Sequence, residues 1–192
     1  MNERFTIRST PLKGLVTLTR HPRCDARGEF ERLFCEQELA AVLPAGRRVV
    51  QINRSLTAAP GFIRGMHFQH PPHAETKIVS CVLGKVFDVA VDVRPGSPTQ
   101  YQWHGVVLSA DDHTSLVIPE GFAHGFQTLT ANCELLYFHT EAWSADAEAG
   151  LHSLDPALAI QWPLPVAGMS DRDCNHPFIS VNKPRATLEA AA

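Results

Sequence analysis

The 192-residue sequence has little of what marks a membrane protein, a secreted protein or a nucleic-acid-binding protein. Its apolar runs are far shorter than the ~20 residues that span a bilayer. The first ten residues, MNERFTIRST, contain no apolar segment of the kind found in secretory signals. Seventeen basic and twenty acidic residues give a net charge of −3, which provides no general attraction to nucleic acid or to an anionic membrane. These absences predict a soluble, cytoplasmic protein that binds neither nucleic acid nor membrane.

Cysteine is also sparse. The five cysteines stand at positions 24, 35, 81, 133 and 174, and no two of them form a CxxC pair. An odd number at this spacing favours neither a disulfide framework nor a zinc knuckle, so reduced thiols are expected. The chain also lacks a glycine-rich dinucleotide fingerprint, and we therefore expect no bound nicotinamide.

The composition is that of one folded domain, with 44% hydrophobic and 19% charged residues. We find no internal repeat, and the predicted organisation is a single domain over residues 1–183 followed by a flexible tail over 184–192. Fourteen prolines and twelve glycines divide the chain into short segments. Short segments with tight turns are typical of β-rich folds.

The middle of the chain is rich in β-branched residues and predicts strands. Ile78–Leu83 and Val86–Val93 flank Gly84-Lys85, a two-residue turn of the Gly-X kind. Alternation within Val86–Val93 places Phe87, Val89, Val91 and Val93 on one face and Asp88, Ala90 and Asp92 on the other. Further strands are expected at Arg48–Asn53, Ile63–Phe68, Gln102–Leu108, Ser115–Ile118, Gly125–Leu129 and Glu134–His139.

Helical signals are few. The best one is Glu36–Leu43, which Pro44 and Gly46 would end, and weaker ones lie at Asp146–Leu151 and near the C-terminus. The sequence therefore predicts an all-β fold, an antiparallel barrel or jelly roll with a few short peripheral helices.

The densest group of chemically active residues is RGMHFQHPPHAETKIV, residues 64–79. His67 lies within an apolar strand, where a core histidine and a functional one are equally good interpretations. His70 and His73 flank two prolines and are more simply exposed loop residues. Lys77 opens the next strand, where a lysine is usually a solvated edge charge.

A second polar group is IPEGFAHGF, residues 118–126, in which His124 lies in a turn that feeds a strand. Two histidine-bearing strands also fit a metal-binding cupin, which needs three or four ligands around one ion. The usual HxH is missing, because the chain reads His67-Phe68-Gln69-His70. The pattern therefore favours a cupin-like fold without its metal. Tyr137, in ELLYFHTEAW, is by itself most simply a core residue with a hydrogen-bonded hydroxyl.

Seven motifs together carry a family resemblance. Between about Leu12 and Asp173 the sequence resembles the dTDP-4-dehydrorhamnose 3,5-epimerase family, whose members use a metal-free, cupin-like jelly roll. The motifs are DARGEF (25–30), VQINRS (50–55), RGMHFQ (64–69), TKIV (76–79), DVAVDVR (88–94), IPEGFAHGF (118–126) and MSDRD (169–173).

The resemblance implies a cofactor-independent isomerase that inverts C3 and C5 of a nucleotide-linked 4-keto-6-deoxy sugar. Both protons lie α to the C4 ketone, so the site needs a base, a donor at the ketone oxygen and an acid on the opposite face. The matching residues are His67 as base, Asp173 as the carboxylate that orients it, Lys77 at the C4 oxyanion and Tyr137 as the acid.

The resemblance also implies a binding set. Arginines 27, 64 and 172 match positions that hold the diphosphate, which suits guanidinium geometry. The remaining matches are Gln51 and Asn53 for the nucleotide or sugar, His124 facing the sugar, Trp143 at the position that stacks on thymine, and Glu148 as a further substrate contact. Because Arg64 and His67 are three apart, a regular strand would point them to opposite faces. Both reach one cavity only if the strand bulges, and Gly65 is a suitable place.

The sequence departs from the family pattern in three ways. Arg32 replaces a glutamate, Trp143 replaces a tyrosine, and Phe-His-Thr-Glu-Ala-Trp follows Tyr137 where a lysine and paired tyrosines are usual. These changes affect the nucleotide end of the site and leave the base identity open. They also leave open whether one or both carbons are inverted.

Three other functions are alternatives to epimerisation at both carbons. They are a single-site C3- or C5-epimerase of a modified nucleotide sugar, a metal-dependent cupin oxygenase or isomerase using His67, His70 and His124, and a non-catalytic sugar-nucleotide binding module. The resemblance further implies a homodimer in which an N-terminal segment joins the partner's sheet and completes its site. Suitable strands for that exchange are Phe5–Ile7 and Leu15–Leu18.

Overall fold

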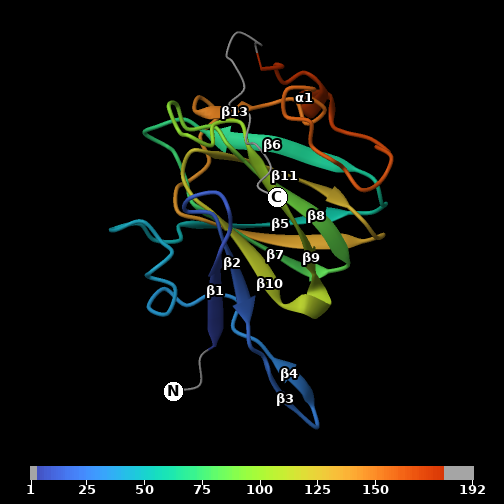
Figure 1. Cartoon of the computed structure of the whole chain (residues 1–192). Helices are drawn as coiled ribbons and strands as arrows, with labels where there is room; N and C mark the ends of the chain where they lie inside the picture. Colours follow the sequence, from blue (N-terminus) through green and yellow to red (C-terminus); the bar gives the residue numbers. More distant parts are fainter. Residues whose placement is uncertain (1–3, 180–192) are drawn as a thin grey trace, which may run out of the picture.

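The computed structural model describes residues 4–179, and nearly all of its regular structure is β (Figure 1). A six-stranded sheet has the order β1-β2-β10-β7-β12-β5, and a five-stranded sheet has the order β13-β6-β11-β8-β9. Every neighbouring pair is antiparallel. The predicted antiparallel jelly roll is therefore confirmed.

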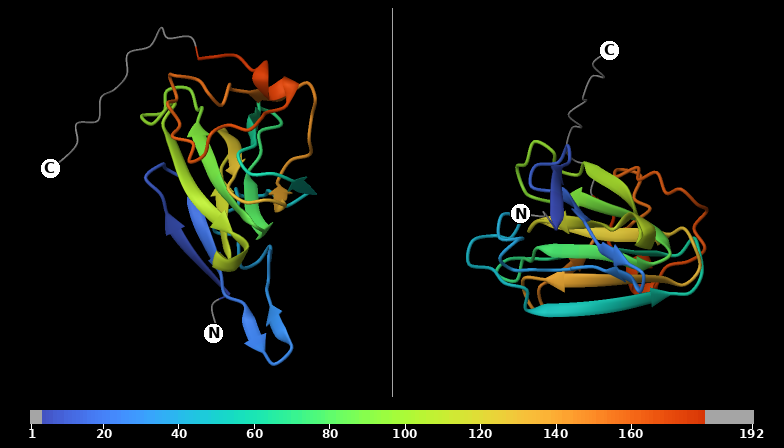
Figure 2. Two further views of the ribbon diagram at one scale, coloured as in Figure 1. Left: turned by 90° about the vertical axis from the view of Figure 1, so that its right-hand side faces the viewer. Right: turned by 90° about the horizontal axis from the view of Figure 1, so that it is seen from below.

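The strands of the larger sheet are β1 (Phe5–Ser9), β2 (Val16–Arg20), β10 (Thr114–Ile118), β7 (Lys77–Leu83), β12 (Cys133–His139) and β5 (Gln51–Thr57). Those of the smaller sheet are β13 (Glu148–Gly150), β6 (Ile63–Gln69), β11 (Phe122–Thr128), β8 (Lys85–Asp92) and β9 (Trp103–Ser109). The hairpin of β3 (Arg23–Asp25) and β4 (Gly28–Phe30) lies apart from both sheets, at the opposite end of the molecule from the short helix α1 (Asp171–Cys174) (Figures 1 and 2). A 3₁₀ turn, η1, covers Ala110–Asp112.

The main core lies between the two sheets. Val79 and Leu135 of the larger sheet pack in one cluster with Ala90 and Phe126 of the smaller sheet, and all four are at most 2% exposed. The predicted alternation in β8 is confirmed, because Ala90 joins this cluster while Val89 and Val91 join a second cluster on the outer face. The sheet is thus buried on both faces at β8, which explains why this strand carries apolar side chains on both of them.

The turn at Gly84 does not join a hairpin. β7 and β8 follow each other in the chain, but β7 pairs with β10 and β12, whereas β8 pairs with β11 and β9. Gly84 has a φ of +77°, and a Cβ there would lie 2.6 Å from the Thr130 hydroxyl oxygen. The glycine is needed where the chain leaves one sheet for the other. The predicted two-residue turn is wrong, because Lys85 already belongs to β8.

Two predicted helices are also wrong. Residues 36–43 form consecutive turns in which buried Leu39 packs under the larger sheet with Ile78 and Phe138. Eight residues are too few for a helix to persist without tertiary support, so this packing decides the local structure. In place of a helix at Asp146–Leu151 the chain makes a turn and then β13.

Several boundaries differ slightly from expectation. The strand expected from Arg48 begins at Gln51 and runs on to Thr57. α1, with only four residues, is the helix found near the C-terminus, while the tail expected at 184–192 lies outside the described residues. None of the helices in residues 4–179 is long and apolar enough to cross a membrane.

Candidate active site

A cavity of about 800 Å³ opens into the molecule, and strands of both sheets line it. Its lining includes histidine, arginine and lysine side chains and the hydroxyl groups of serine and tyrosine. Of the predicted site residues, all except Arg27 line this cavity: Gln51, Asn53, Arg64, His67, Lys77, His124, Tyr137, Trp143, Glu148, Arg172 and Asp173.

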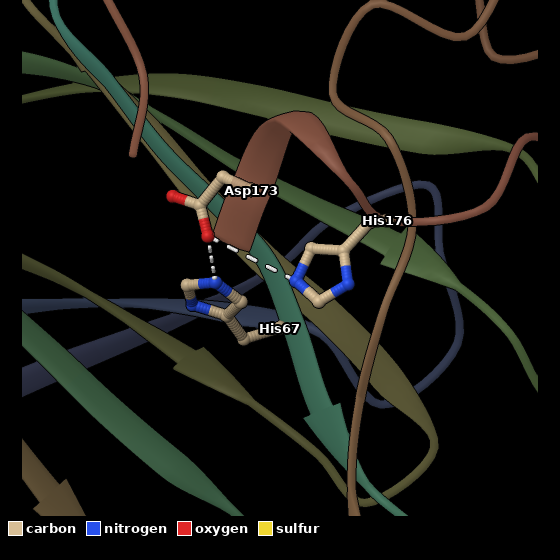
Figure 3. A group of neighbouring side chains, drawn as sticks. All are labelled: His67, Asp173 and His176. Carbon is tan, nitrogen blue, oxygen red and sulfur yellow. Dashed lines mark hydrogen bonds and ion pairs between the residues drawn. The ribbon is translucent and has the colours of Figure 1, made fainter. Parts of the chain in front are cut away.

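A histidine–carboxylate pair lies in the wall of the cavity. His67, on β6, holds its Nε2 2.7 Å from Oδ1 of Asp173, which α1 presents (Figure 3). Ser170 caps α1 by accepting a hydrogen bond from the Asp173 N–H at 3.1 Å, which fixes the carboxylate's position. Because an ionised carboxylate only accepts, the hydrogen sits on Nε2 of His67 and Nδ1 keeps the lone pair that can take a proton.

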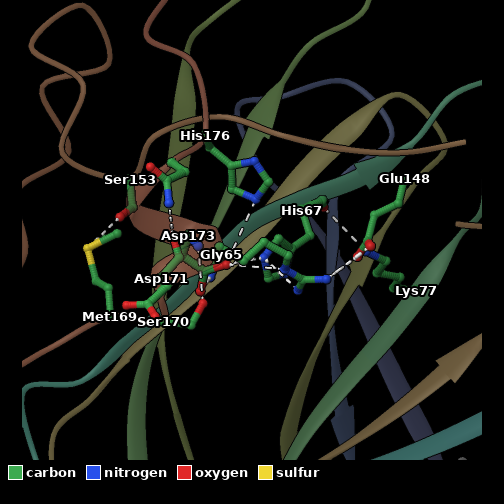
Figure 4. Close-up of polar contacts among 12 residues, drawn as sticks. Gly65, His67, Lys77, Glu148, Ser153, Met169, Ser170, Asp171, Asp173 and His176 are labelled. Atoms are coloured by element: carbon green, nitrogen blue, oxygen red, sulfur yellow. Dashed lines mark hydrogen bonds and ion pairs between the residues drawn. The ribbon is translucent and has the colours of Figure 1, made fainter. Parts of the chain in front are cut away.

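Asp173 is held in its charged form. It is 3% exposed, and burial on its own would raise the pKa of the carboxyl group. The hydrogen bond and charge of His67, the Gly65 N–H at 3.3 Å and the Ser170 cap together lower that pKa below its usual value (Figure 4). The charged carboxylate accepts the hydrogen bond from Nε2 and so fixes the orientation of the His67 ring.

A bulge in β6 brings Arg64 and His67 to the same cavity, as the spacing required. His67 pairs with His124 and Arg64 with Phe126, so the two residues of β6 between these pairs face a single residue of β11. Gly65 has a φ of +123°, and a Cβ there would lie 2.5 Å from the Gly125 Cα. The bulge therefore depends on glycine at position 65, and this prediction is confirmed.

Lys77 begins β7 and points into the cavity from the larger sheet. Its Nζ lies 3.1 Å from Oε1 of Glu75 and 3.3 Å from the carbonyl oxygen of His67, to which it donates. Oε2 of Glu75 lies 2.7 Å from Nδ1 of His139. Burial would raise the pKa of Glu75, but the hydrogen bond from His139 and the charge of Lys77 lower it. Neither Glu75 nor His139 was predicted as a site residue from the sequence, although His139 shares strand parity with Tyr137.

Tyr137 enters the cavity from β12, beside Lys77 on the larger sheet. Its hydroxyl lies 2.9 Å from Oγ of Ser55, on the neighbouring strand β5. Burial raises the pKa of Tyr137 above its usual value, against the opposing hydrogen bond of Ser55, so the phenol stays protonated. The His124 ring lies edge-on to Tyr137 at 6.1 Å, and its Nε2 is held by the buried Asp88 at 2.9 Å.

The outer part of the cavity carries the other predicted binding residues. The Arg172 guanidinium contacts both Glu148 carboxylate oxygens at 3.0 Å. Its Nη2 lies 3.2 Å from Nε2 of His67, a contact that is not a hydrogen bond while that nitrogen donates to Asp173. Gln51 accepts a hydrogen bond from the Trp143 N–H at 3.1 Å, while the Trp143 side chain is left 57% exposed. An exposed indole beside a cavity has a free face for stacking.

Arg27 lies elsewhere. It stands in the turn of the β3–β4 hairpin with its side chain 89% exposed, and it pairs with Asp25. Figure 1 places this hairpin at the far end of the molecule from α1 and its residue Asp173. Within one chain, Arg27 does not reach the cavity of its own barrel.

The histidines of the metal-cupin alternative, His67, His70 and His124, do not form a group with ligand-like spacing, although His67 and His124 are neighbours across β6 and β11. Within residues 4–179, the group with ligand-like spacing consists of His67, Asp173 and His176, whose atoms lie within 4.8 Å of one another (Figure 3). His70 is exposed and is absent from the cavity lining, and His124 is held by Asp88. His176 rests against Gly150, where a Cβ would come within 2.4 Å of the ring.

Residues 9–180 match the family model described as dTDP-4-dehydrorhamnose 3,5-epimerase. The chain belongs to this family. The dTDP-4-dehydrorhamnose 3,5-epimerase of Sinorhizobium fredii is 43% identical over 156 residues, which cover 81% of this chain and 80% of that protein. Members of this family are isomerases, as the motifs predicted.

Solved structures of family members share the fold. The dTDP-6-deoxy-D-glucose-3,5-epimerase of Legionella pneumophila, in complex with dTDP-4-keto-L-rhamnose, matches with a TM-score of 0.86 at 36% identity and covers 96% of this chain and 100% of that chain. A 3'-monoepimerase from Streptomyces bikiniensis, in complex with dTDP-quinovose, matches with a TM-score of 0.81 at 30% identity and covers 88% of this chain and 85% of that chain. The family thus contains relatives described as acting at two carbons and at one.

Proposed function

We propose that the chain epimerises a dTDP-4-keto-6-deoxyhexose at C3, C5 or both, converting dTDP-4-dehydro-6-deoxyglucose to a dTDP-4-dehydrorhamnose-type product. The observation that carries this proposal is the entry of His67 from one sheet, and of Lys77 and Tyr137 from the other, into a single cavity. Inversion needs groups on both faces of a sugar carbon, and facing sheets supply them. Family membership supports the substrate class.

In the proposed mechanism, Nδ1 of neutral His67 removes a proton α to the C4 ketone. The electron pair of the C–H bond forms the C=C bond of an enolate while the π pair of the C4 carbonyl moves onto its oxygen, and the Lys77 ammonium stabilises this oxyanion by a charge-assisted hydrogen bond. Tyr137 then donates its phenolic proton to the opposite face of the same carbon, and the carbonyl re-forms. Asp173 holds the His67 ring and stabilises the imidazolium through its 2.7 Å contact.

The residues proposed to bind the substrate line the same cavity. We propose that Arg64 and Arg172 bind the diphosphate, since guanidinium groups pair well with phosphate oxygens. Trp143 is proposed to stack on the nucleobase, a role that its exposed indole supports. The proposed sugar and nucleotide contacts are Gln51, Asn53, His124 and Glu148.

We further propose a homodimer in which Arg27 acts in the partner's cavity. The larger sheet ends at β5, whose outward side chains Ile52 and Leu56 are 59% and 51% exposed. An open, apolar edge strand is a ready partner for a strand of a second chain. The distance of the β3–β4 hairpin from its own cavity supports its use in trans. We also place the protein in the cytoplasm, because its cysteine spacing offers no disulfide framework.

The test of the activity is incubation with dTDP-4-dehydro-6-deoxyglucose in deuterated water, followed by proton NMR. We expect deuterium at each carbon that exchanges and new couplings at each carbon that inverts. Exchange and inversion confined to one carbon would identify a single-site epimerase instead. An absence of both would reject the proposed function.

Arg27 is tested by complementation. We expect Arg27→Ala and His67→Asn homodimers to be nearly inactive, and co-expressed heterodimers to regain about one wild-type site per dimer if Arg27 acts in trans. In such a heterodimer one cavity has native His67 and the partner's native Arg27. Failure of the heterodimer to recover activity, or a monomer with full activity by light scattering, would contradict the strand-exchanged dimer.

A further inference from the structure

We propose that Glu75 is a positioning residue for Lys77, and that His139 holds Glu75 in place for this purpose. This inference rests on the proposed function, because it concerns the donor that stabilises the C4 oxygen. Glu75 stands in the loop directly before β7 and lines the cavity. Its role would be to aim the lysine, without itself touching the reacting carbon.

The backbone around Glu75 is fixed by the end of β12. The Thr76 N–H donates to Oγ1 of Thr140 at 2.8 Å, and the Thr140 N–H donates to the Thr76 carbonyl at 3.1 Å. Thr76 and Thr140 are 1% and 3% exposed, so water does not compete for these bonds. The loop therefore presents Glu75 from a rigid point between Lys77 and His139.

Both carboxylate oxygens of Glu75 are occupied. Oε1 lies 3.1 Å from Nζ of Lys77 and Oε2 lies 2.7 Å from Nδ1 of His139, with the Glu75 side chain 7% exposed. A carboxylate that accepts from both sides has little rotational freedom. It is a fixed acceptor, and charge-assisted bonds of this kind are stronger than neutral ones.

The ammonium group of Lys77 has three N–H donors. Nζ forms an ion pair with Oε1 of Glu75 at 3.1 Å and donates to the His67 carbonyl, 3.3 Å away. In the described part of the chain no further acceptor lies within hydrogen-bond distance of Nζ, so the third N–H is available to a ligand oxygen in the cavity. Two fixed acceptors leave this third direction defined, as a preorganised oxyanion donor requires.

His139 links this arrangement to the binding side of the cavity. Its Nδ1 donates to Glu75, and its Nε2 lies 3.4 Å from Nδ2 of Asn53 on β5. The ring stacks on Tyr137 with 6.2 Å between centroids. His139 is thus held on both ring nitrogens, and its orientation fixes the second oxygen of Glu75.

The test compares Glu75→Gln with the wild type, using turnover and deuterium exchange on dTDP-4-dehydro-6-deoxyglucose. Glutamine keeps the shape but loses the charge, so we expect kcat to fall about 10- to 100-fold, below the full loss of an oxyanion donor. KM and the affinity for dTDP should stay within about threefold, because Glu75 is outside the predicted nucleotide contacts. Glu141→Gln is the matched control, since Glu141 pairs with Arg47 at 2.7 Å and does not line the cavity.

A double-mutant cycle with Lys77→Met separates positioning from general damage. We expect Glu75→Gln to lower kcat no further in the Lys77→Met background. His139→Asn, whose amide can replace Nδ1 as donor to Glu75, should retain more activity than His139→Leu. Wild-type kcat in Glu75→Gln, or an equal loss with and without Lys77, would overturn the inference. An inactive wild type would instead reject the proposed function itself.

Discussion

Replacing Tyr137 by phenylalanine should separate proton exchange from inversion. The substitution keeps the ring, which packs edge-on to His124 and stacks on His139 at centroid distances of 6.1 and 6.2 Å. It removes the hydroxyl that lies 2.9 Å from Oγ of Ser55. Loss of one such hydrogen bond costs about 0.5–1.5 kcal/mol of folding free energy, so the variant should fold.

The effect on inversion should be much larger. Burial raises the pKa of Tyr137 above its usual value, which keeps the phenol protonated and able to donate across the neutral and mildly alkaline range. Removing a general acid typically costs about 10²–10⁴-fold in rate. Exchange on one face needs only His67, which can remove a proton and return a deuteron to the same side. We therefore expect inversion to fall by two to four orders of magnitude, with exchange much less affected.

The assay is proton NMR of dTDP-4-dehydro-6-deoxyglucose incubated with the variant in deuterated water. Deuterium should appear at C3 or C5 of substrate that has kept its configuration. Tyr101→Phe is the matched control, because Tyr101 is the other of the chain's two tyrosines and lies outside the cavity lining. Equal loss of exchange and inversion would show that Tyr137 shapes the site, and normal inversion would remove it from the mechanism.

Three further outcomes are expected. His67→Asn should abolish proton exchange at every carbon while the affinity for dTDP stays within a few-fold. Asp173→Asn should also lower exchange, but less severely. Exchange near the wild-type rate in His67→Asn would show that another residue is the base. Lys77→Ala should raise the activation free energy for turnover by about 2.7–4 kcal/mol and so lower kcat. Chelators should leave the activity of the wild type unchanged. Loss of activity with chelator and its recovery with added metal would favour the metal-cupin alternative. The pKa of Asp92 is lowered to about 2 by Arg94, Ser97 and Thr99 against the effect of burial, so its charged form stabilises the fold above pH 4 and this contribution is lost as the pH falls toward 2. Denaturant unfolding should therefore show Asp92→Asn less stable than wild type by about 2 kcal/mol at pH 7, with a gap that narrows in acid; a constant gap would contradict this assignment.

Local patterns predicted those parts of the fold that depend on neighbours in sequence. The alternation in Val86–Val93 correctly predicted which side chains of β8 lie on the inner face of the sheet and which on the outer face. Parity alone required a bulge between Arg64 and His67, and the register shift against β11 confirms it. Both features follow from the two-residue repeat of a strand, which any segment of a few residues reveals.

Features that depend on distant partners were missed for a physical reason. Glycine at position 84 signals a tight, left-handed backbone but does not say which strands the turn joins, and here it joins two sheets. In residues 36–43 the burial of Leu39 under the larger sheet outweighs a weak helical preference. Propensity contributes tenths of a kcal/mol per residue, whereas burying one leucine contributes about 1.5–3 kcal/mol.

The same distinction applies inside the cavity. His67 was found because a family motif carries it, and Tyr137 because it matches a family position. Glu75 and His139 stand 64 residues apart and meet only when β7 and β12 pair. The register of that pair sets His139 directly opposite Lys77, which is why one carboxylate can reach both. A buried, two-sided carboxylate is costly unless both neighbours donate, so Glu75, Lys77 and His139 form a set that must change together. Substituting one member alone should therefore lower the free energy of unfolding more than substituting all three with apolar residues of similar volume.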